Sequence, residues 1–219
     1  MIRPTRLSFF LTLLITATFA YLHVLSDGGS FEGAQPKALF ISMLVSSLAS
    51  LAVMSLPILS EALRRRDTLH RLFSADVFRT VPRGRALLSI ILAFVVIFSA
   101  AMMLLSILPA DAEQDLAQAL RLLSLPQKAV LSICICVLTP LVEEILFRGI
   151  LMHSFPQRIA IPASAFCFAL AHGLSGIDFP LFLIGILLAL EVRRTGTLWS
   201  AVALHGAFNL LNLLLVESL

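Results

Sequence analysis

Three charged residues interrupt the apolar segment LTPLVEEILFRGIL, residues 138–151. Each charge near the middle of a membrane costs about 3 kcal/mol or more, so each one needs a partner or a function. Glu144 and Arg148 are four residues apart, share one helix face and can neutralise each other. Glu143 lies about 100° away around the helix, with Phe147 at its own i+4 position. A glutamate without a partner at this depth is a candidate general base.

Two histidines and one asparagine occupy later apolar segments, at His172, His205 and Asn209. If each segment is a helix entering from the same side, Glu143, His172 and His205 lie at one depth, roughly 13–17 Å inside. Asn209 follows His205 by one turn on the same face. Each residue alone is explained as well by a hydrogen bond between helices, but together they predict one site. Pro140 precedes Glu143, removes a backbone hydrogen bond and should kink that helix.

The elements that must position these side chains are membrane helices. The 219-residue chain is 59% hydrophobic and 13% charged, whereas soluble domains contain about 25% charged residues. We therefore expect an all-α polytopic membrane protein whose active site lies inside a bundle of about seven transmembrane helices. The apolar runs place these helices at residues 6–25, 37–62, 86–108, 127–152, 160–173, 179–192 and 197–216.

The distribution of basic residues predicts an orientation, because loops rich in Lys and Arg face the cytoplasm. The basic loop 64–85 is placed inside by this rule, and the N-terminus with it. The acidic loops 26–36 and 109–127 and the C-terminal Glu217 then lie outside. We expect an integral protein of the cell (inner) membrane with a cytoplasmic N-terminus. The basic start and apolar core of the first segment would also suit a signal peptide, but the unbroken apolar run favours a retained helix.

Three short motifs carry a family resemblance: EEILFR fits E-E-x-x-x-R, FALAH fits F-x-x-x-H, and HGAFN fits H-x-x-x-N. In this order and spacing they resemble the CPBP family of intramembrane proteases. That family includes the type II CAAX prenyl endopeptidases and proteins of bacteriocin processing and immunity. The resemblance covers about residues 130–214. It divides the chain into N-terminal transmembrane helices and loops without a recognised signature, residues 1–126, and a protease-like core, residues 127–219.

The resemblance implies hydrolysis of a peptide bond within the membrane. By motif position, Glu143 would activate the water and His172 would help to hold it. His205 and Asn209 would stabilise the oxyanion, as donors fixed in a site of low dielectric should. Three further motif residues would support the site: Glu144, Arg148 and Phe168.

These residues are compatible with either a zinc-dependent or a metal-free reaction. Glu143, His172 and His205 with one open position would suit catalytic zinc, and members of the family are commonly called metalloproteases. The same residues can also activate water without a metal, and the sequence lacks the H-E-x-x-H pattern of many zinc proteases.

The expected partners are the lipid bilayer and a membrane-associated protein or peptide substrate. The family resemblance suggests a lipid-modified or small membrane-bound peptide that is cut near its C-terminus. A nucleic-acid partner is not expected, because no basic patch is interleaved with aromatic residues. Two other functions are compatible with the same residues. A proton- or ion-coupled transporter would also use intramembrane charges, although no inverted repeat is found. A non-catalytic immunity or scaffold protein could share the same fold.

Overall fold

The computed structural model of the protein describes residues 5–25, 35–64, 120–172 and 178–218. Within these ranges the regular elements are helices and no strand occurs, which confirms the all-α class. The predicted helix 86–108 and most of the basic loop 64–85 lie outside the described residues.

Six of the predicted helices are present in the described ranges, and their ends lie within three residues of the predicted ones. The first two are α1 (Arg6–Leu25) and α2 (Pro36–Arg64). The predicted helix 127–152 extends over residues 125–154 and has five parts: α6 (Leu125–Ile133), the π-helical η2 (Cys134–Leu138), α7 (Thr139–Glu144), the π-helical η3 (Ile145–Leu151) and α8 (Met152–Ser154). The remaining helices are α9 (Ala160–Ala171), α10 (Asp178–Thr195) and α11 (Leu198–Ser218).

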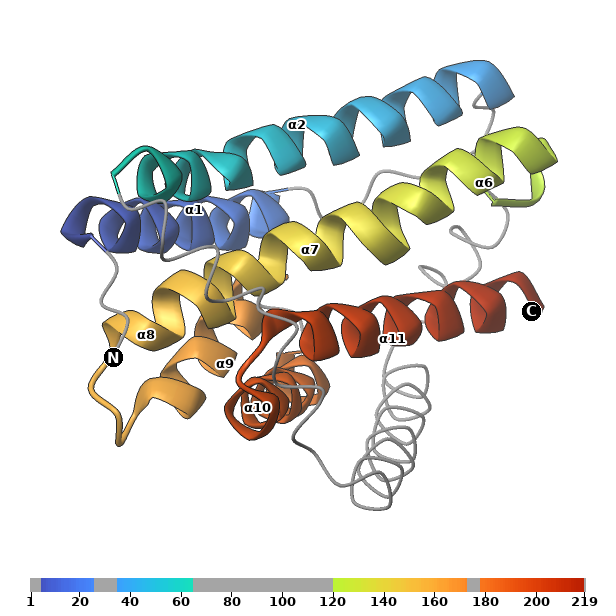
Figure 1. Ribbon diagram of the computed structural model, residues 1–219. Helices are drawn as coiled ribbons and strands as arrows, with labels where there is room; N and C mark the ends of the chain where they lie inside the picture. The colour runs from blue at the N-terminus through green and yellow to red at the C-terminus, as the bar shows by residue number, and fades with distance from the viewer. Residues whose placement is uncertain (1–4, 26–34, 65–119, 173–177, 219) are drawn as a thin grey trace, which may run out of the picture.

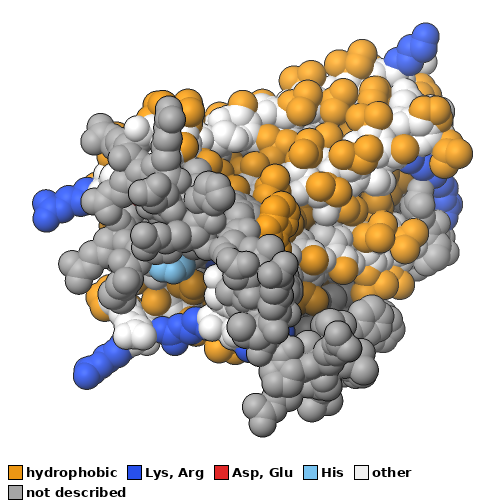
Figure 2. Space-filling model, viewed as in Figure 1, with side chains coloured by type: hydrophobic (Ala, Val, Ile, Leu, Met, Phe, Trp, Pro, Cys, Tyr) orange, Lys and Arg blue, Asp and Glu red, His pale blue; other side chains and the backbone are white. Residues whose placement is uncertain are grey.

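Within the described ranges, three helical stretches are long and apolar enough to cross a bilayer: Pro36–Leu63, Leu125–Ser154 and Leu198–Leu215. Hydrophobic side chains cover much of the face shown in Figure 2, and Lys and Arg lie toward its periphery. Such an apolar surface marks contact with lipid, so the protein is an integral membrane protein. The count of seven crossings stays a prediction. Large apolar side chains are exposed along α2 at Leu48, Val53, Leu56, Leu59 and Leu63.

The predicted disturbance of the long helix at Pro140 takes the form of a π-helical turn. Proline has no N–H to donate, so the regular ladder of backbone hydrogen bonds is broken there. The turn η2 ends two residues before Pro140, and the N–H of Thr139 bonds to the Cys134 carbonyl, five residues back. A second π-helical turn, η3, follows α7 directly. The two glutamates of α7 thus lie between π-helical turns, which frequently occur at functional sites.

The other helices pack closely around this long helix. In Figure 1, α2 and α11 run along its two sides, and both contact α7, while α9 packs on α10 and α1. Gly206 on α11 lies directly against the Cys136 carbonyl of η2, where a Cβ atom would overlap the oxygen. A Cβ atom on Gly185 of α10 would lie 2.9 Å from the Cβ atom of Ala165 on α9. Both glycines therefore permit helix approaches that a larger residue would prevent.

A buried carboxylate that was not predicted joins α1 to α2. The side chain of Glu61 is fully buried, and its Oε2 accepts hydrogen bonds from the Thr5 N–H at 3.0 Å, the Thr5 hydroxyl at 3.1 Å and the Ser8 hydroxyl at 2.6 Å. N–H groups at the start of a helix have no partner within the helix and favour a negative charge. Glu61 therefore fixes the N-terminal end of α1 against the C-terminal end of α2.

Candidate active site

Glu143 lies near the end of α7 with its side chain directed into the bundle. It is 6% exposed, and its Oε2 atom is buried without a hydrogen-bond partner among the described residues. A buried carboxylate oxygen in that condition is costly unless a proton, a water or a ligand reaches it. Glu143 thus makes no hydrogen bond through this oxygen, in keeping with the lack of an i+4 partner in the sequence.

Two imidazoles from other helices face this oxygen atom. His172 Nε2, at the end of α9, lies 3.9 Å from Glu143 Oε2, and His205 Nε2, on α11, lies 3.6 Å from it. The structure therefore brings together the carboxylate and both histidines that the sequence places at one depth. Both distances exceed a direct hydrogen bond, and they are short enough for one water molecule to contact the carboxylate and an imidazole together.

The other ring nitrogen of each histidine is already engaged. His172 Nδ1 lies 2.8 Å from the Phe168 carbonyl oxygen, which can only accept, so Nδ1 carries the proton. His205 Nδ1 lies 3.0 Å from Glu144 Oε1, and a carboxylate accepts in the same way. In a neutral ring each Nε2 is then an acceptor facing Glu143. The tautomer of both histidines is set by these second hydrogen bonds.

The predicted ion pair between Glu144 and Arg148 is confirmed. Arg148 Nη1 donates to Glu144 Oε1 at 2.8 Å, and neither side chain is exposed at all. Arg148 Nη2 also donates to the Gly185 carbonyl at 3.1 Å, and the guanidinium lies 4.5 Å from the centre of the Phe168 ring. One carboxylate thus binds both Arg148 and His205. The Glu144–Arg148 pair thus links the long helix to α10 through the Gly185 carbonyl and to α11 through His205.

Asn209 makes a hydrogen bond between helices, the alternative to a direct catalytic function. Its Nδ2 donates to the Ile135 carbonyl in η2 at 2.8 Å. A π-helical turn before a proline leaves carbonyls without their usual donors, and the Asn209 amide satisfies one of them. The second hydrogen on Nδ2 is not used in that bond.

Two side chains that were not identified from the sequence bond to carbonyls of the second π-helical turn. The buried Ser164 hydroxyl on α9 donates to the Phe147 carbonyl at 2.9 Å. His153 Nδ1 donates to the Arg148 carbonyl at 2.8 Å. A serine within a run of small residues shows no sign of this function in the sequence.

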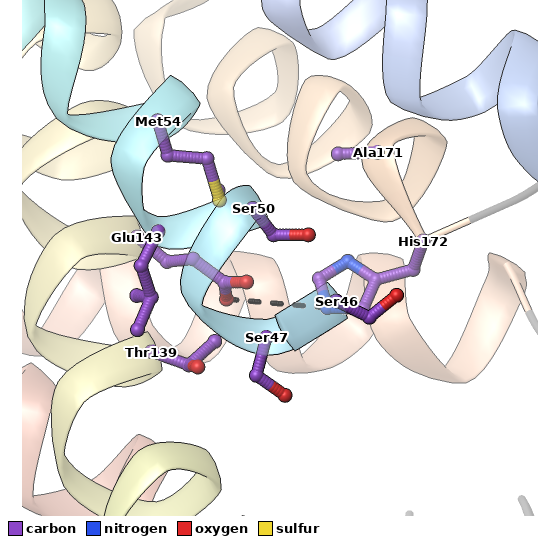
Figure 3. Close-up of a pocket in the computed structure, with 9 residues that line it drawn as sticks. Ser46, Ser47, Ser50, Met54, Thr139, Glu143, Ala171 and His172 are labelled. Atoms are coloured by element: carbon purple, nitrogen blue, oxygen red, sulfur yellow. Dashed lines mark ion pairs between the residues drawn. The ribbon is translucent and has the colours of Figure 1, made fainter. Parts of the chain in front are cut away.

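A cavity of about 320 Å³ opens beside Glu143 and His172. Figure 3 shows their carboxylate and imidazole directed toward each other across it. The opposite wall belongs to α2, a helix that carries no functional signature in its sequence. The lining residues not identified from the sequence include Ser46, Ser47, Ser50, Met54 and Thr139. No local pattern singles these residues out, because α2 carries further serines at positions 42, 55 and 60.

The donor types of this site suit zinc, but their positions do not. Ligand atoms about 2.0–2.2 Å from a tetrahedral zinc lie about 3.4 Å apart, closer than the two distances from Glu143 Oε2 to the imidazoles. In the part of the chain that the structure describes, no group of three His, Cys, Asp or Glu side chains is placed to hold a metal ion.

Residues 125–211 match the family described as type II CAAX prenyl endopeptidase Rce1-like. The matched segment runs from the start of α6 into α11 and contains Glu143, His172 and His205. The resemblance predicted from the three motifs is therefore confirmed. No curated protein and no solved structure matches the chain.

Proposed function

We propose that the protein is an intramembrane endopeptidase in which Glu143 activates a water molecule for attack on a peptide bond. The observation that carries the proposal is the buried Glu143 Oε2 atom, which has no hydrogen-bond partner among the described residues and faces two imidazole Nε2 atoms. The similarity of residues 125–211 to a family of proteases supports the same reaction class. Three apolar helices long enough to cross a bilayer support a reaction within the membrane.

In the first step a water molecule lies between Glu143 Oε2 and the Nε2 atom of His172. The water donates one hydrogen to the carboxylate and the other to the imidazole, which leaves an oxygen lone pair directed at the substrate carbonyl. As the new C–O bond forms, Glu143 takes the proton, and the carbonyl electron pair moves onto the oxygen to give a tetrahedral oxyanion. General-base catalysis of this kind contributes about 10²–10⁴ in rate.

In the second step the tetrahedral intermediate collapses and the C–N bond breaks. Glu143 returns its proton to the leaving nitrogen, so one water is consumed and the products are a carboxylic acid and an amine. We propose that His205 donates to the oxyanion from Nε2 in its doubly protonated form, which takes that proton from solvent before the attack and keeps it through both steps. The second hydrogen of Asn209 Nδ2 is the further donor we propose. Donors held in place before reaction are effective because little reorganisation is needed.

Glu144 and Arg148 act on this chemistry through His205. Glu144 Oε1 accepts from His205 Nδ1 and so points Nε2 toward Glu143. Arg148 holds that carboxylate in place from the same helix. We assign them positioning functions, together with Phe168, whose ring lies against both Arg148 and His205.

The substrate we propose is a membrane-associated peptide cut near its C-terminus, and the family description makes a prenylated CAAX peptide the first one to test. Purified protein in proteoliposomes should convert a farnesylated CAAX peptide into two products. Mass spectrometry should show that their summed mass exceeds that of the peptide by one water. The same peptide without the farnesyl group tests whether the lipid is recognised. Intact peptide in both cases would contradict the proposed substrate class.

We also propose that the N-terminus and the loop 64–85 face the cytoplasm and that the C-terminus faces the opposite side. Single cysteines introduced at Arg71 and Ser218 should react with a membrane-impermeant maleimide from opposite sides of sealed vesicles. The expected result is labelling of the Ser218→Cys protein from the external side of intact cells and of the Arg71→Cys protein only after lysis. Labelling of both from one side would contradict seven crossings.

A further inference from the structure

The α2 wall of the cavity carries a set of hydroxyl groups beside the proposed catalytic residues. Ser46 and Ser50 lie one helical turn apart and therefore share a face. Thr139, one turn before Glu143 on the long helix, adds a third hydroxyl. Figure 3 shows these side chains around the space between Glu143 and His172.

The hydroxyls of Ser46 and Ser50 differ from two other serine hydroxyls of α2 that are bonded within the helix; among the described residues, Ser42 and Ser60 are unbonded too but do not line the cavity. Ser47 donates to the Met43 carbonyl at 2.9 Å and Ser55 donates to the Leu51 carbonyl at 2.7 Å, each four residues back in α2. Among the described residues, the hydroxyls of Ser46 and Ser50 make no such bond. A serine hydroxyl can both donate and accept, so each can pair with an N–H or with a carbonyl of a ligand.

An independent observation marks the same cavity as a ligand site. Glu143 lines it, and its Oε2 atom is buried without a partner in the described part of the chain. The cavity is therefore lined by a residue with an unsatisfied buried acceptor and by the hydroxyl groups of Ser46 and Ser50, which have not formed bonds within their own helix. Apart from Glu143 and His172, the lining residues are uncharged, and Leu51, Met54 and Ala171 are apolar.

Size and chemistry together limit what fits. A cavity of about 320 Å³ is at the small end of ligand sites, which span roughly 300–1,000 Å³. A helix with its side chains is about 10–12 Å across and satisfies its own backbone bonds. An extended segment instead presents one N–H and one carbonyl per residue, which must find partners away from water. Neutral hydroxyls suit those groups, and the nearby Glu143 disfavours a carboxylate terminus in the same space.

We propose that the hydroxyl groups of Ser46, Ser50 and Thr139 bind the uncharged peptide backbone next to the scissile bond in extended form. Met54 and Ala171 then contact a short aliphatic side chain of that segment. The inference rests on the proposed function, because Glu143 must reach a carbonyl held in this space. It assigns substrate binding to α2, which precedes the segment that matches the protease family.

The test compares Ser46→Ala, Ser50→Ala and the double variant with Ser42→Ala in the purified full-length protein. Ser42 lies on α2 one turn before Ser46, does not line the cavity, and makes no hydroxyl bond to another described residue. Alanine is the better helix former, so these variants should keep the fold. The probe is a fluorescent farnesylated CAAX peptide, measured for cleavage and, in the Glu143→Gln background, for binding.

We expect each lining variant to lower kcat/KM by about threefold to tenfold, the effect of one neutral hydrogen bond. The double variant should lose about 10-fold to 100-fold, and Ser42→Ala should stay within about twofold. N-methylation of the peptide removes the N–H that bonds to a serine hydroxyl. The N-methylated peptide should therefore bind the wild-type protein more weakly than the unmodified peptide does, whereas the corresponding serine variant should bind the two peptides equally.

Failure of this inference is distinct from failure of the proposed function. If Glu143→Gln abolishes cleavage while the lining variants behave like Ser42→Ala, the hydroxyl site is wrong and the protease stands. If the wild-type protein does not cleave the probe, the proposed function fails for this substrate, and the hydroxyl site is then tested by peptide binding alone. Binding weakened by Ser46→Ala and Ser50→Ala, but not by Ser42→Ala, would support it. Absent binding, or equal binding in all variants, would overturn it.

Discussion

Replacing Glu143 by glutamine should abolish peptide cleavage while leaving the protein as stable as wild type. The amide keeps the size of the side chain but cannot take the proton from the attacking water, so the rate should fall by about 10²–10⁴ or more. Stability should be preserved because the Oε2 atom of Glu143 makes no hydrogen bond within the described residues. The measurements are peptide turnover by mass spectrometry and the melting temperature in detergent.

The neighbouring substitution Glu144→Gln is the matched control for Glu143→Gln. Glu144 accepts from Arg148 and His205, so its loss should lower the melting temperature clearly, whereas Glu143→Gln should not. Cleavage that persists in Glu143→Gln would contradict the assignment of the base. Metal analysis of the wild-type protein answers a separate question. Stoichiometric zinc that is lost in His172→Ala would show that the site works with a metal.

Much of the site could be predicted because intramembrane polar residues are few. Apolar runs locate helices through the thickness of the bilayer, and the described helices end within three residues of the predicted ends. The i+4 spacing alone predicts the pair of Glu144 with Arg148, which the structure confirms. Counting residues from the helix ends places Glu143, His172 and His205 at one level, and the structure brings their side chains together.

The remaining features depend on the rotation of each helix about its axis and on side-chain packing, neither of which follows from residue spacing. Whether His205 binds Glu144 or Asn209 bonds to Ile135 depends on how α11 is turned about its axis. That rotation depends in turn on the close approach of Gly206 to η2. The proline of the long helix predicts a broken backbone bond but not a π-helical turn. The contribution of α2 to the cavity is a tertiary contact between segments about 90 residues apart, with no local signal.

Replacing Arg148 by alanine should destabilise the protein by about 3–5 kcal/mol, the usual cost of leaving a buried charge without its partner. Both side chains of the pair are fully buried, so neither water nor lipid headgroups can replace the guanidinium at Glu144. The variant also loses the donor to the Gly185 carbonyl and the cation over the Phe168 ring. Unfolding titrations in SDS and the melting temperature in detergent would measure the loss.

The exposed pair of Arg194 with Glu191 is the matched control, since the chain offers the same two residue types at 2.7 Å in a different environment. The Arg194 side chain is 34% exposed, and an exposed pair contributes only about 0–1 kcal/mol, so Arg194→Ala should change stability little. Because Arg148 acts on catalysis through Glu144 and His205, the Arg148→Ala molecules that do fold should keep part of their activity. A fully folded but inactive Arg148→Ala protein would instead show that the guanidinium contacts the substrate or the reacting atoms.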